Sequence, residues 1–118
     1  MKMKFALLML MCSVMFAGCG HHAASKPVTK IDVAKIVVQS LIDGDVKAME
    51  TVISAPSFAE YAVSSYGPDF AGYKLDDFTF TDTKDLLGED VVIVKSKNGK
   101  INQTLKIEKL GDRYVYNG

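Results

Sequence analysis

The sequence predicts an α+β fold in which N-terminal helices pack on a curved antiparallel sheet of about four strands. The hydrophobic pattern of the chain supports this prediction. Apolar residues recur at three- and four-residue steps between residues 30 and 66, and the period changes to two from residue 73 onward. An uncharged run of 14 residues precedes both segments at the N-terminus. Because the helices come first and the strands second, we expect a single domain over residues 27–118.

The uncharged run has the properties of a signal peptide. Lys2 and Lys4 precede residues 5–18, which carry no charge. The 14 residues of this run match the roughly 7–15 of a signal-peptide core and fall short of the ~20 that a membrane-spanning helix needs. The alternative is a buried core helix, which would show a polar stripe that this run lacks. We therefore expect residues 1–18 to be a signal peptide.

The end of the run, Phe16-Ala17-Gly18-Cys19, distinguishes two kinds of signal peptide. Ordinary signal peptidase requires a small residue third before the cut, where Phe16 is too large. A bulky apolar residue, two small residues and a cysteine in this order resemble the bacterial lipobox, with Phe16 in place of the usual leucine. The resemblance implies that the Cys19 thiol accepts a diacylglyceryl group, since a thiolate is a strong nucleophile. Cys19 would then begin the mature chain.

The same resemblance implies a location on the bacterial cell envelope. Acyl chains hold a protein on a membrane surface at ~0.8 kcal/mol per buried methylene. Gly20 occupies the position where aspartate acts as an inner-membrane retention signal in enteric-type bacteria. We therefore expect a membrane partner reached through lipid on Cys19, and an outer-membrane location if the host is Gram-negative.

Composition excludes several classes of protein. The chain has two cysteines, and with Cys12 in the signal peptide and Cys19 carrying lipid, the domain retains no thiol for a disulfide or metal site. Removing Lys2 and Lys4 leaves 12 basic against 14 acidic side chains without a basic stripe. Nucleic acid is therefore not an expected partner.

Residues 19–26 are short, small and polar, and we expect them to form a flexible tether. His21 and His22 raise the hypothesis of a metal site. Two adjacent histidines on a tether impose little geometry, and no third ligand is spaced to help them. We expect neither a metal nor a cofactor.

The first helix is predicted over residues 30–43. Thr29 and Asp32 form a T-x-x-D start that is close to a capping box. Apolar side chains follow at helical spacing opposite a polar stripe. Gly44 is placed to end the helix in a left-handed conformation, and Asp45 can cap the next helix.

Two further helices are predicted before the sheet. The second has an apolar face that includes Val52 and Ile53, and it stops at Pro56. The third starts at the S-x-x-E capping box of residues 57–60, runs to about residue 66 and is closed by Gly67-Pro68. Its side chains expected to be available to the core are Phe58, Tyr61, Ala62 and Tyr66.

The strands follow, joined by a connection, a predicted hairpin and a turn. Phe78 and Phe80 alternate with threonines, and residues 85–88 form a connection. Residues 91–97 begin with four consecutive β-branched residues, as in a strand buried on both faces. Asn98-Gly99 predicts a hairpin with a type I′ turn. Alternating residues 101–109, a turn at residues 110–112 and a last strand at residues 113–116 complete the sheet.

The helix end SLIDGDVKAMETVIS and the strands VVIVKSKNGKINQTLKIEKLGDRYVYNG resemble the small nuclear transport factor 2-like lipoproteins. One bacterial group of these is labelled lumazine-binding-like and has no settled function. The shared features are the Gly44-Asp45 pair and a final turn before an aromatic residue, here Tyr114 where the group usually has tryptophan. The resemblance covers residues 27–118 and implies a cone-like, cystatin-like fold that can hold a pocket.

Relatives with this fold that are enzymes place an acid or base beside a hydrogen-bond donor inside the cone. A buried Asp77 with a raised pKa could act as a general base. We expect instead that Asp76 and Asp77 are both solvated at a strand edge or turn, because charged residues are rarely buried without a partner. The candidate pocket residues are Tyr61, Tyr66, Tyr73, Asp76 and Asp77.

Three functions remain open from the sequence. The first is an envelope lipoprotein whose domain is non-catalytic and binds an envelope protein or a small apolar ligand. The second is a pocket enzyme of the isomerase or dehydratase type. The third is an envelope inhibitor or exclusion lipoprotein. A cone filled by phenylalanine and valine side chains favours the first, and a buried, unpaired Asp77 facing an apolar cavity favours the second.

Overall fold

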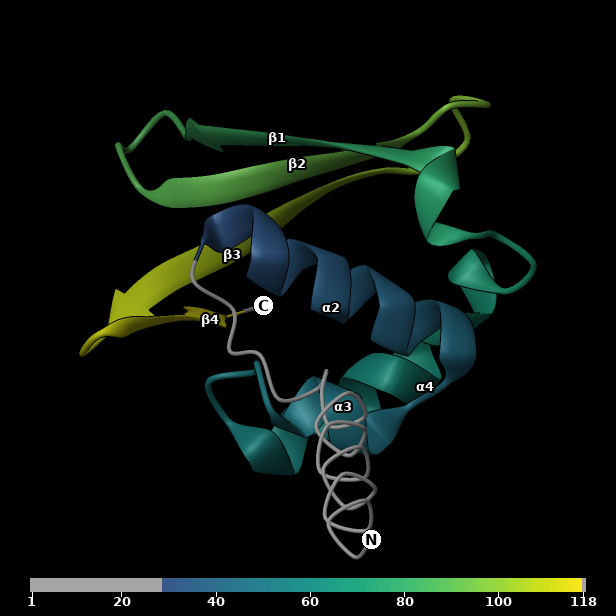
Figure 1. Cartoon of the computed structure of the whole chain (residues 1–118), viewed down its shortest axis with the longest axis horizontal. Helices are drawn as coiled ribbons and strands as arrows, with labels where there is room; N and C mark the ends of the chain where they lie inside the picture. The colour runs from purple at the N-terminus through teal and green to yellow at the C-terminus, as the bar shows by residue number, and fades with distance from the viewer. Residues whose placement is uncertain (1–28, 118) are drawn as a thin grey trace, which may run out of the picture.

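The computed structural model of the protein describes residues 29–117, so the predicted signal peptide, Cys19, the histidine pair and the predicted tether lie outside the described residues. The sheet has four strands. In Figure 1, β1 and β2 lie above α2, β3 runs down past the start of that helix to β4, and α3 and α4 lie below α2. The predicted α+β class is confirmed. The elements are α2 (Lys30–Asp43), α3 (Val46–Glu50), η1 (Pro56–Phe58), α4 (Ala59–Phe70), η2 (Leu75–Asp77), β1 (Phe78–Lys84), β2 (Asp90–Ser96), β3 (Asn102–Leu110) and β4 (Arg113–Tyr116).

The sheet is a simple antiparallel meander in the order β1-β2-β3-β4. Consecutive hairpins place the β1–β2 and β3–β4 connections at one end and the β2–β3 connection at the opposite end. The first turn of α2 lies at the same end as the β1–β2 connection (Figure 1). The β1–β2 connection, the β3–β4 connection and the first turn of α2 therefore lie at the same end of the molecule.

The core forms on both sides of α2, because this helix lies between the sheet and the other two helices (Figure 1). Its residues Val33, Ala34 and Val37 have no exposed surface. On the sheet, the face toward α2 carries alternate residues of each strand, as the pleat requires. The buried hydrophobic residues on that face are Phe78, Val92, Val94, Leu105, Ile107 and Tyr116.

The predicted caps of the first two helices are confirmed. The Thr29 hydroxyl accepts a hydrogen bond from the Asp32 amide at 3.0 Å, and the Asp32 carboxylate accepts one from the Thr29 amide at 3.1 Å. Gly44 ends α2 with φ of 68°, and the Asp45 carboxylate caps α3 through the Ala48 amide. These motifs act within one turn, so neighbouring residues alone determine them.

The second helix is shorter than predicted. It ends at Glu50, and Ile53 instead forms a parallel bridge to Tyr116 of β4. The amides of Ser54 and Tyr116 donate to the carbonyls of Tyr116 and Val52, respectively. Val52 and Ile53 are buried as predicted, but as an extended segment beside the sheet, because the last strand offers backbone partners that a continued helix would forgo.

The third helix differs from its prediction at both ends. No side-chain cap forms at Ser57, and Pro56 opens a 3-10 turn instead. Pro68 lies within α4, which continues to Phe70. Phe70 is buried and stacks on Phe78 with ring centroids 5.6 Å apart, so core packing extends the helix past the proline. Gly67 is also buried, and its α-carbon faces the Leu41 carbonyl of α2 closely enough that a β-carbon would lie 3.4 Å from it.

The β2–β3 hairpin is confirmed, but its predicted type I′ turn is wrong. Among the described residues no residue other than glycine has a positive φ, so Asn98 cannot occupy the first position of that turn. The Asn98 side-chain oxygen instead accepts hydrogen bonds from the Lys100 amide and the Ser96 hydroxyl. The Ile101 amide donates to the same hydroxyl, and these polar side chains stabilise a longer loop.

Candidate functional site

The space between α2 and the sheet is occupied by side chains. Val37 and Val38 of α2 belong to one buried cluster with Val92, Val94 and Ile107 of the strands, and none of the five has more than 1% of its surface exposed. Phe78 and Phe70 occupy the end nearest η2. The interior formed by these residues is therefore packed like an ordinary protein core.

The predicted base, Asp77, has a local structural role. Its carboxylate accepts a hydrogen bond from the Lys74 amide at 2.8 Å and so caps η2. Its carbonyl accepts one from the Lys97 amide at 2.8 Å. Asp77 therefore lies at a turn before β1, as in the alternative prediction, although its side chain is half-buried and not fully solvated.

Tyr73 lies four residues before Asp77 in the sequence, but Asp77 does not line the depression that Tyr73 lines. The Tyr73 ring packs on Phe78 with centroids 5.3 Å apart, and its hydroxyl accepts a hydrogen bond from the side-chain nitrogen Nδ2 of Asn98 at 3.1 Å. It lines an open depression of about 440 Å³ with residues of β3 and of the preceding loop. Tyr73 therefore holds the β2–β3 loop against the core.

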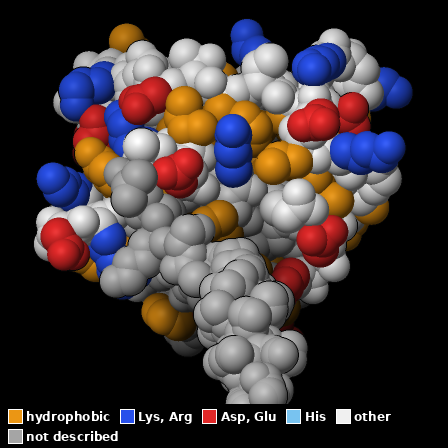
Figure 2. Space-filling model, viewed as in Figure 1, with side chains coloured by type: hydrophobic (Ala, Val, Ile, Leu, Met, Phe, Trp, Pro, Cys, Tyr) orange, Lys and Arg blue, Asp and Glu red, His pale blue; other side chains and the backbone are white. Residues whose placement is uncertain are grey.

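Asp76 lines a second depression, of about 560 Å³, which we call the α2–β1 groove. Its apolar lining comes from Ile31, Leu75, Phe78 and Phe80, and its charged lining from Lys35, Asp76 and Lys97. The Lys35 ammonium lies 5.9 Å from the centre of the Phe80 ring. Figure 2 shows hydrophobic side chains with interspersed basic ones in the part of the surface where α2 meets the strands.

Tyr61 and Tyr66 are exposed on α4, so the expectation that they join the core is wrong. Phe58, Tyr61 and Tyr66 are 50%, 54% and 44% exposed. Their rings form a chain of contacts, with centroids 5.0 Å apart for Phe58–Tyr61 and 6.5 Å for Tyr61–Tyr66. The inner face of α4 is taken by smaller residues such as Ala62 and Val63. We call the exposed residues Phe58, Tyr61 and Tyr66 the aromatic surface.

The aromatic surface approaches the last strand. Burial, with a smaller contribution from nearby Tyr66, raises the pKa of the Tyr116 hydroxyl. Tyr61 and Tyr66 are thus exposed, whereas Tyr116 is buried. Tyr61 and Tyr66 share neither groove with Tyr73 or Asp76, and the predicted pocket residues do not form one site in the described part of the chain.

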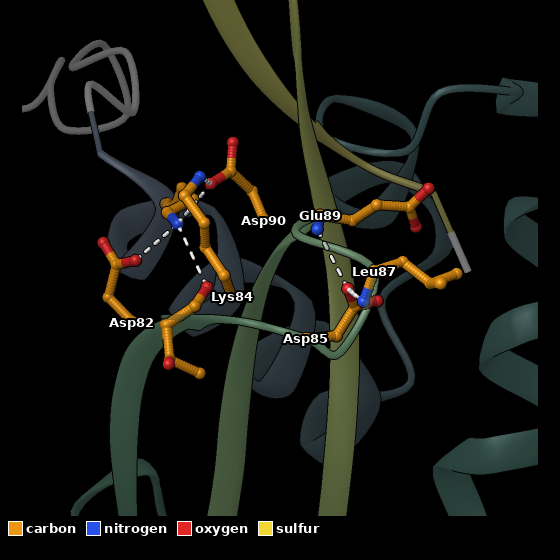
Figure 3. Close-up of polar contacts among 8 residues, drawn as sticks. Asp82, Lys84, Asp85, Leu87, Glu89 and Asp90 are labelled. Atoms are coloured by element: carbon orange, nitrogen blue, oxygen red, sulfur yellow. Dashed lines mark hydrogen bonds and ion pairs between the residues drawn. The ribbon is translucent and has the colours of Figure 1, made fainter.

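Sequence reasoning missed a charged cluster at the end where α2 begins. Lys30 is 8% exposed, and its ammonium contacts Asp82 at 2.5 Å and Asp90 at 3.0 Å, one residue on each of two strands (Figure 3). Lys84 also contacts Asp90, at 2.6 Å. The only signal in the sequence is that Lys30 occupies a helix position on the side of the buried Val33 and Val37, which nothing local distinguishes from a surface lysine.

The charges in this cluster perturb one another. Burial alone would lower the pKa of Lys30, but the hydrogen bonds to Asp82 and Asp90 outweigh it and raise that pKa. Hydrogen bonds from Lys84 and Lys30 lower the pKa of the Asp90 carboxyl. The cluster ties the first turn of α2 to β1 and β2. Each charge has an opposite partner, as expected of a structural ion-pair network.

Residues 29–117 contain neither a candidate membrane-spanning helix nor a cluster of candidate metal ligands. None of the helices there has the length and apolar character that a bilayer crossing requires. No three histidine, cysteine, aspartate or glutamate side chains of this segment meet as a metal site would require. Comparison with known protein families, curated proteins and solved structures finds no match to this chain.

Proposed function

We propose that the protein is a bacterial envelope lipoprotein, anchored through Cys19, whose domain is non-catalytic and binds another envelope protein. The lipobox-like Phe16-Ala17-Gly18-Cys19 supports the anchor. The observation that carries the binding role is the aromatic surface on α4. Aromatic residues are enriched at the centres of protein interfaces, because they bury a large area at a small cost in conformational entropy.

The packed interior supports a binding role over catalysis. An enzyme of the isomerase type needs an acid or base and a donor converging on a substrate atom. Asp77 instead caps η2, and the tyrosines that could donate lie on other surfaces. We further propose that the domain is related to the nuclear transport factor 2-like proteins. Helices followed by an open antiparallel meander wrapped on α2 support this relation.

The anchor is tested by metabolic labelling with a radioactive fatty acid in a bacterial host. We expect label in the wild-type protein and none in Cys19→Ser. Equal labelling of the two proteins would refute lipidation at this residue. Because Cys12 is the other cysteine in the chain, Cys12→Ser is the matched control and should retain the label.

The binding role is tested by photo-crosslinking in intact cells. A photoreactive phenylalanine analogue at Tyr61 should give one dominant protein adduct, and the same analogue at Lys100, which is exposed at the far β2–β3 loop, should not. Loss of the adduct in Cys19→Ser would locate the partner on the envelope. The same weak, heterogeneous products at both positions would refute the aromatic surface as an interface. Identification of the crosslinked protein also distinguishes an accessory role from an inhibitor or exclusion role, because these roles involve different partners.

A second candidate is binding of a small amphipathic ligand in the α2–β1 groove. The groove's volume falls in the ~300–1,000 Å³ range of ligand sites, and two lysines, Lys35 and Lys97, border its apolar floor. An anionic head group with a short apolar tail fits this arrangement. Lys35→Glu together with Lys97→Glu should abolish binding of such a ligand and leave the Tyr61 adduct unchanged.

A further inference from the structure

The β1–β2 connection, residues 85–89, exposes two adjacent leucines. The exposed fractions of Leu86 and Leu87 are 103% and 82%, the highest among the exposed large hydrophobic side chains of residues 29–117. Leu110, at the neighbouring β3–β4 turn, is 49% exposed. Full exposure of two leucines side by side is costly unless another apolar phase covers them. We call residues 85–89 the leucine loop.

The backbone of the leucine loop is hydrogen-bonded internally. One oxygen of the Asp85 carboxylate accepts from the amides of Leu87 and Glu89, each at 2.9 Å (Figure 3). The Asp85 amide donates to the Glu89 carbonyl, and the Gly88 amide donates to the Asp85 carbonyl. Four of the loop's five amides therefore have partners within it. A loop of this kind can leave water at low cost, because few amides lose a water partner.

Charges at the base of the leucine loop are also paired. Glu89 contacts Lys106 at 2.7 Å, and Asp90 contacts both Lys84 and Lys30. Each acidic side chain that flanks the leucines on the β2 side is thus neutralised by a lysine. The electrostatic repulsion that bare carboxylates would meet at an anionic lipid surface is reduced accordingly.

The leucine loop lies at the end of the molecule where the described chain begins. Lys30 contacts Asp90, directly beyond the loop, and Asp82, just before it. Ten residues separate Cys19 from Lys30, so this contact lies at most about 40 Å from Cys19 even with the intervening chain fully extended. A flexible chain of that length has a typical span of about 20 Å.

We infer that the leucine loop inserts Leu86 and Leu87 into the interfacial region of the leaflet that holds the acyl chains on Cys19. The inference rests on the proposed anchor. The anchor brings one end of the domain to the membrane, and the leucines on that end enter the boundary between head groups and acyl chains. The domain then has a fixed orientation, with the β2–β3 loop directed away from the leaflet.

The absence of tryptophan from the chain makes a direct test practical. Leu86→Trp and Leu87→Trp each introduce a single tryptophan at an exposed position, and Lys100→Trp introduces one at the opposite end of the sheet. Each lipid-modified full-length mature protein is reconstituted in vesicles of phosphatidylethanolamine and phosphatidylglycerol, with or without brominated acyl chains. Flotation of the vesicles measures anchoring, and tryptophan emission measures contact with the leaflet.

We expect all three proteins to float with the vesicles. Emission of Leu86→Trp and Leu87→Trp should shift to shorter wavelength and lose intensity in brominated lipid, whereas Lys100→Trp should do neither. If the proteins float and all three emissions remain unquenched, the contact between the loop and the leaflet is refuted and the anchor stands. A protein partner would then be the candidate that covers Leu86 and Leu87. Proteins that do not float refute the anchor and, with it, the orientation from which the loop contact follows.

Discussion

Replacing Lys30 by methionine tests how the first turn of α2 is held to the sheet. Methionine keeps an unbranched apolar stem of similar length and removes the ammonium that contacts Asp82 and Asp90. Hydrogen bonds between charged groups contribute about 1.5–3 kcal/mol each. The two carboxylate side chains remain 45% and 31% exposed, so water compensates part of the loss.

We therefore expect Lys30→Met to reduce the free energy of unfolding by about 2 kcal/mol, less than the ~3–5 kcal/mol lost when a fully buried pair is broken. For a domain of this size, the midpoint of thermal unfolding should fall by about 10 °C. Urea unfolding followed by circular dichroism measures the difference. Lys100→Met, which removes an exposed lysine at the other end of the sheet, is the control and should stay within about 0.5 kcal/mol of wild type.

The pH dependence gives the same prediction a second readout. The lowered pKa of Asp90 provides stability above its unfolded value of about 3.9, and this stability is lost as pH falls through the folded value. The raised pKa of Lys30 provides stability below its unfolded value of about 10.4, and this is lost as pH rises through the folded value. The difference between wild type and Lys30→Met should therefore be largest at neutral pH and shrink toward both extremes. Equal stability of the two proteins at neutral pH would refute the reasoning, because the attraction would then only offset the cost of burying the lysine.

Three further predictions concern the fold. Gly44→Ala should lower the free energy of unfolding in urea by about 1–2 kcal/mol, because φ is 68° at this position. Gly67→Ala should be nearly neutral, since the higher helix propensity of alanine offsets the close contact with the Leu41 carbonyl. Equal effects of the two substitutions would contradict the assigned backbone. Thr29→Ala should cost about 1 kcal/mol by removing the cap of α2, and no loss would mean that α2 begins elsewhere. Ile107→Ala, at a fully buried position, should cost about 2–5 kcal/mol in the same assay, and a loss below 1 kcal/mol would show that the core beneath α2 is looser than described.

Local motifs were the most predictable part of the fold. The capping residues of α2 and α3 and the left-handed Gly44 depend on atoms within one helical turn, so their sequence spacing was sufficient. Period-two alternation predicted β1 and β3, because one face of the sheet must pack on the helix, and four consecutive β-branched residues predicted β2. Val91 and Val92, adjacent and both buried, confirm that β2 begins covered on both faces.

The errors arose where distant residues compete with local preference. Pro68 would end an isolated helix, but burial of Phe70 against Phe78 extends α4 by two residues. Ile53 leaves the predicted helical face because Tyr116, far along the chain, pairs with it. Neither partner can be recognised from the segment in which the prediction was made.

The candidate surfaces were less predictable than the fold. Tyr61 and Tyr66 lie at helical spacing compatible with a core face, and their exposure follows from Ala62 and Val63 facing α2 instead. The residues that meet at Lys30 are separated by more than 50 positions along the chain. A site assembled across such separations requires the structure, because sequence spacing carries no information about it.

The central claim is that Cys19 carries lipid and fastens the domain to the envelope. Intact-mass spectrometry of the protein purified from bacterial membranes, with fragmentation of its N-terminal peptide, tests this claim most directly. We predict that the chain begins at Cys19 and that this residue carries a thioether-linked diacylglyceryl group. An unmodified Cys19, or a chain that begins at any residue downstream of it, would contradict the account.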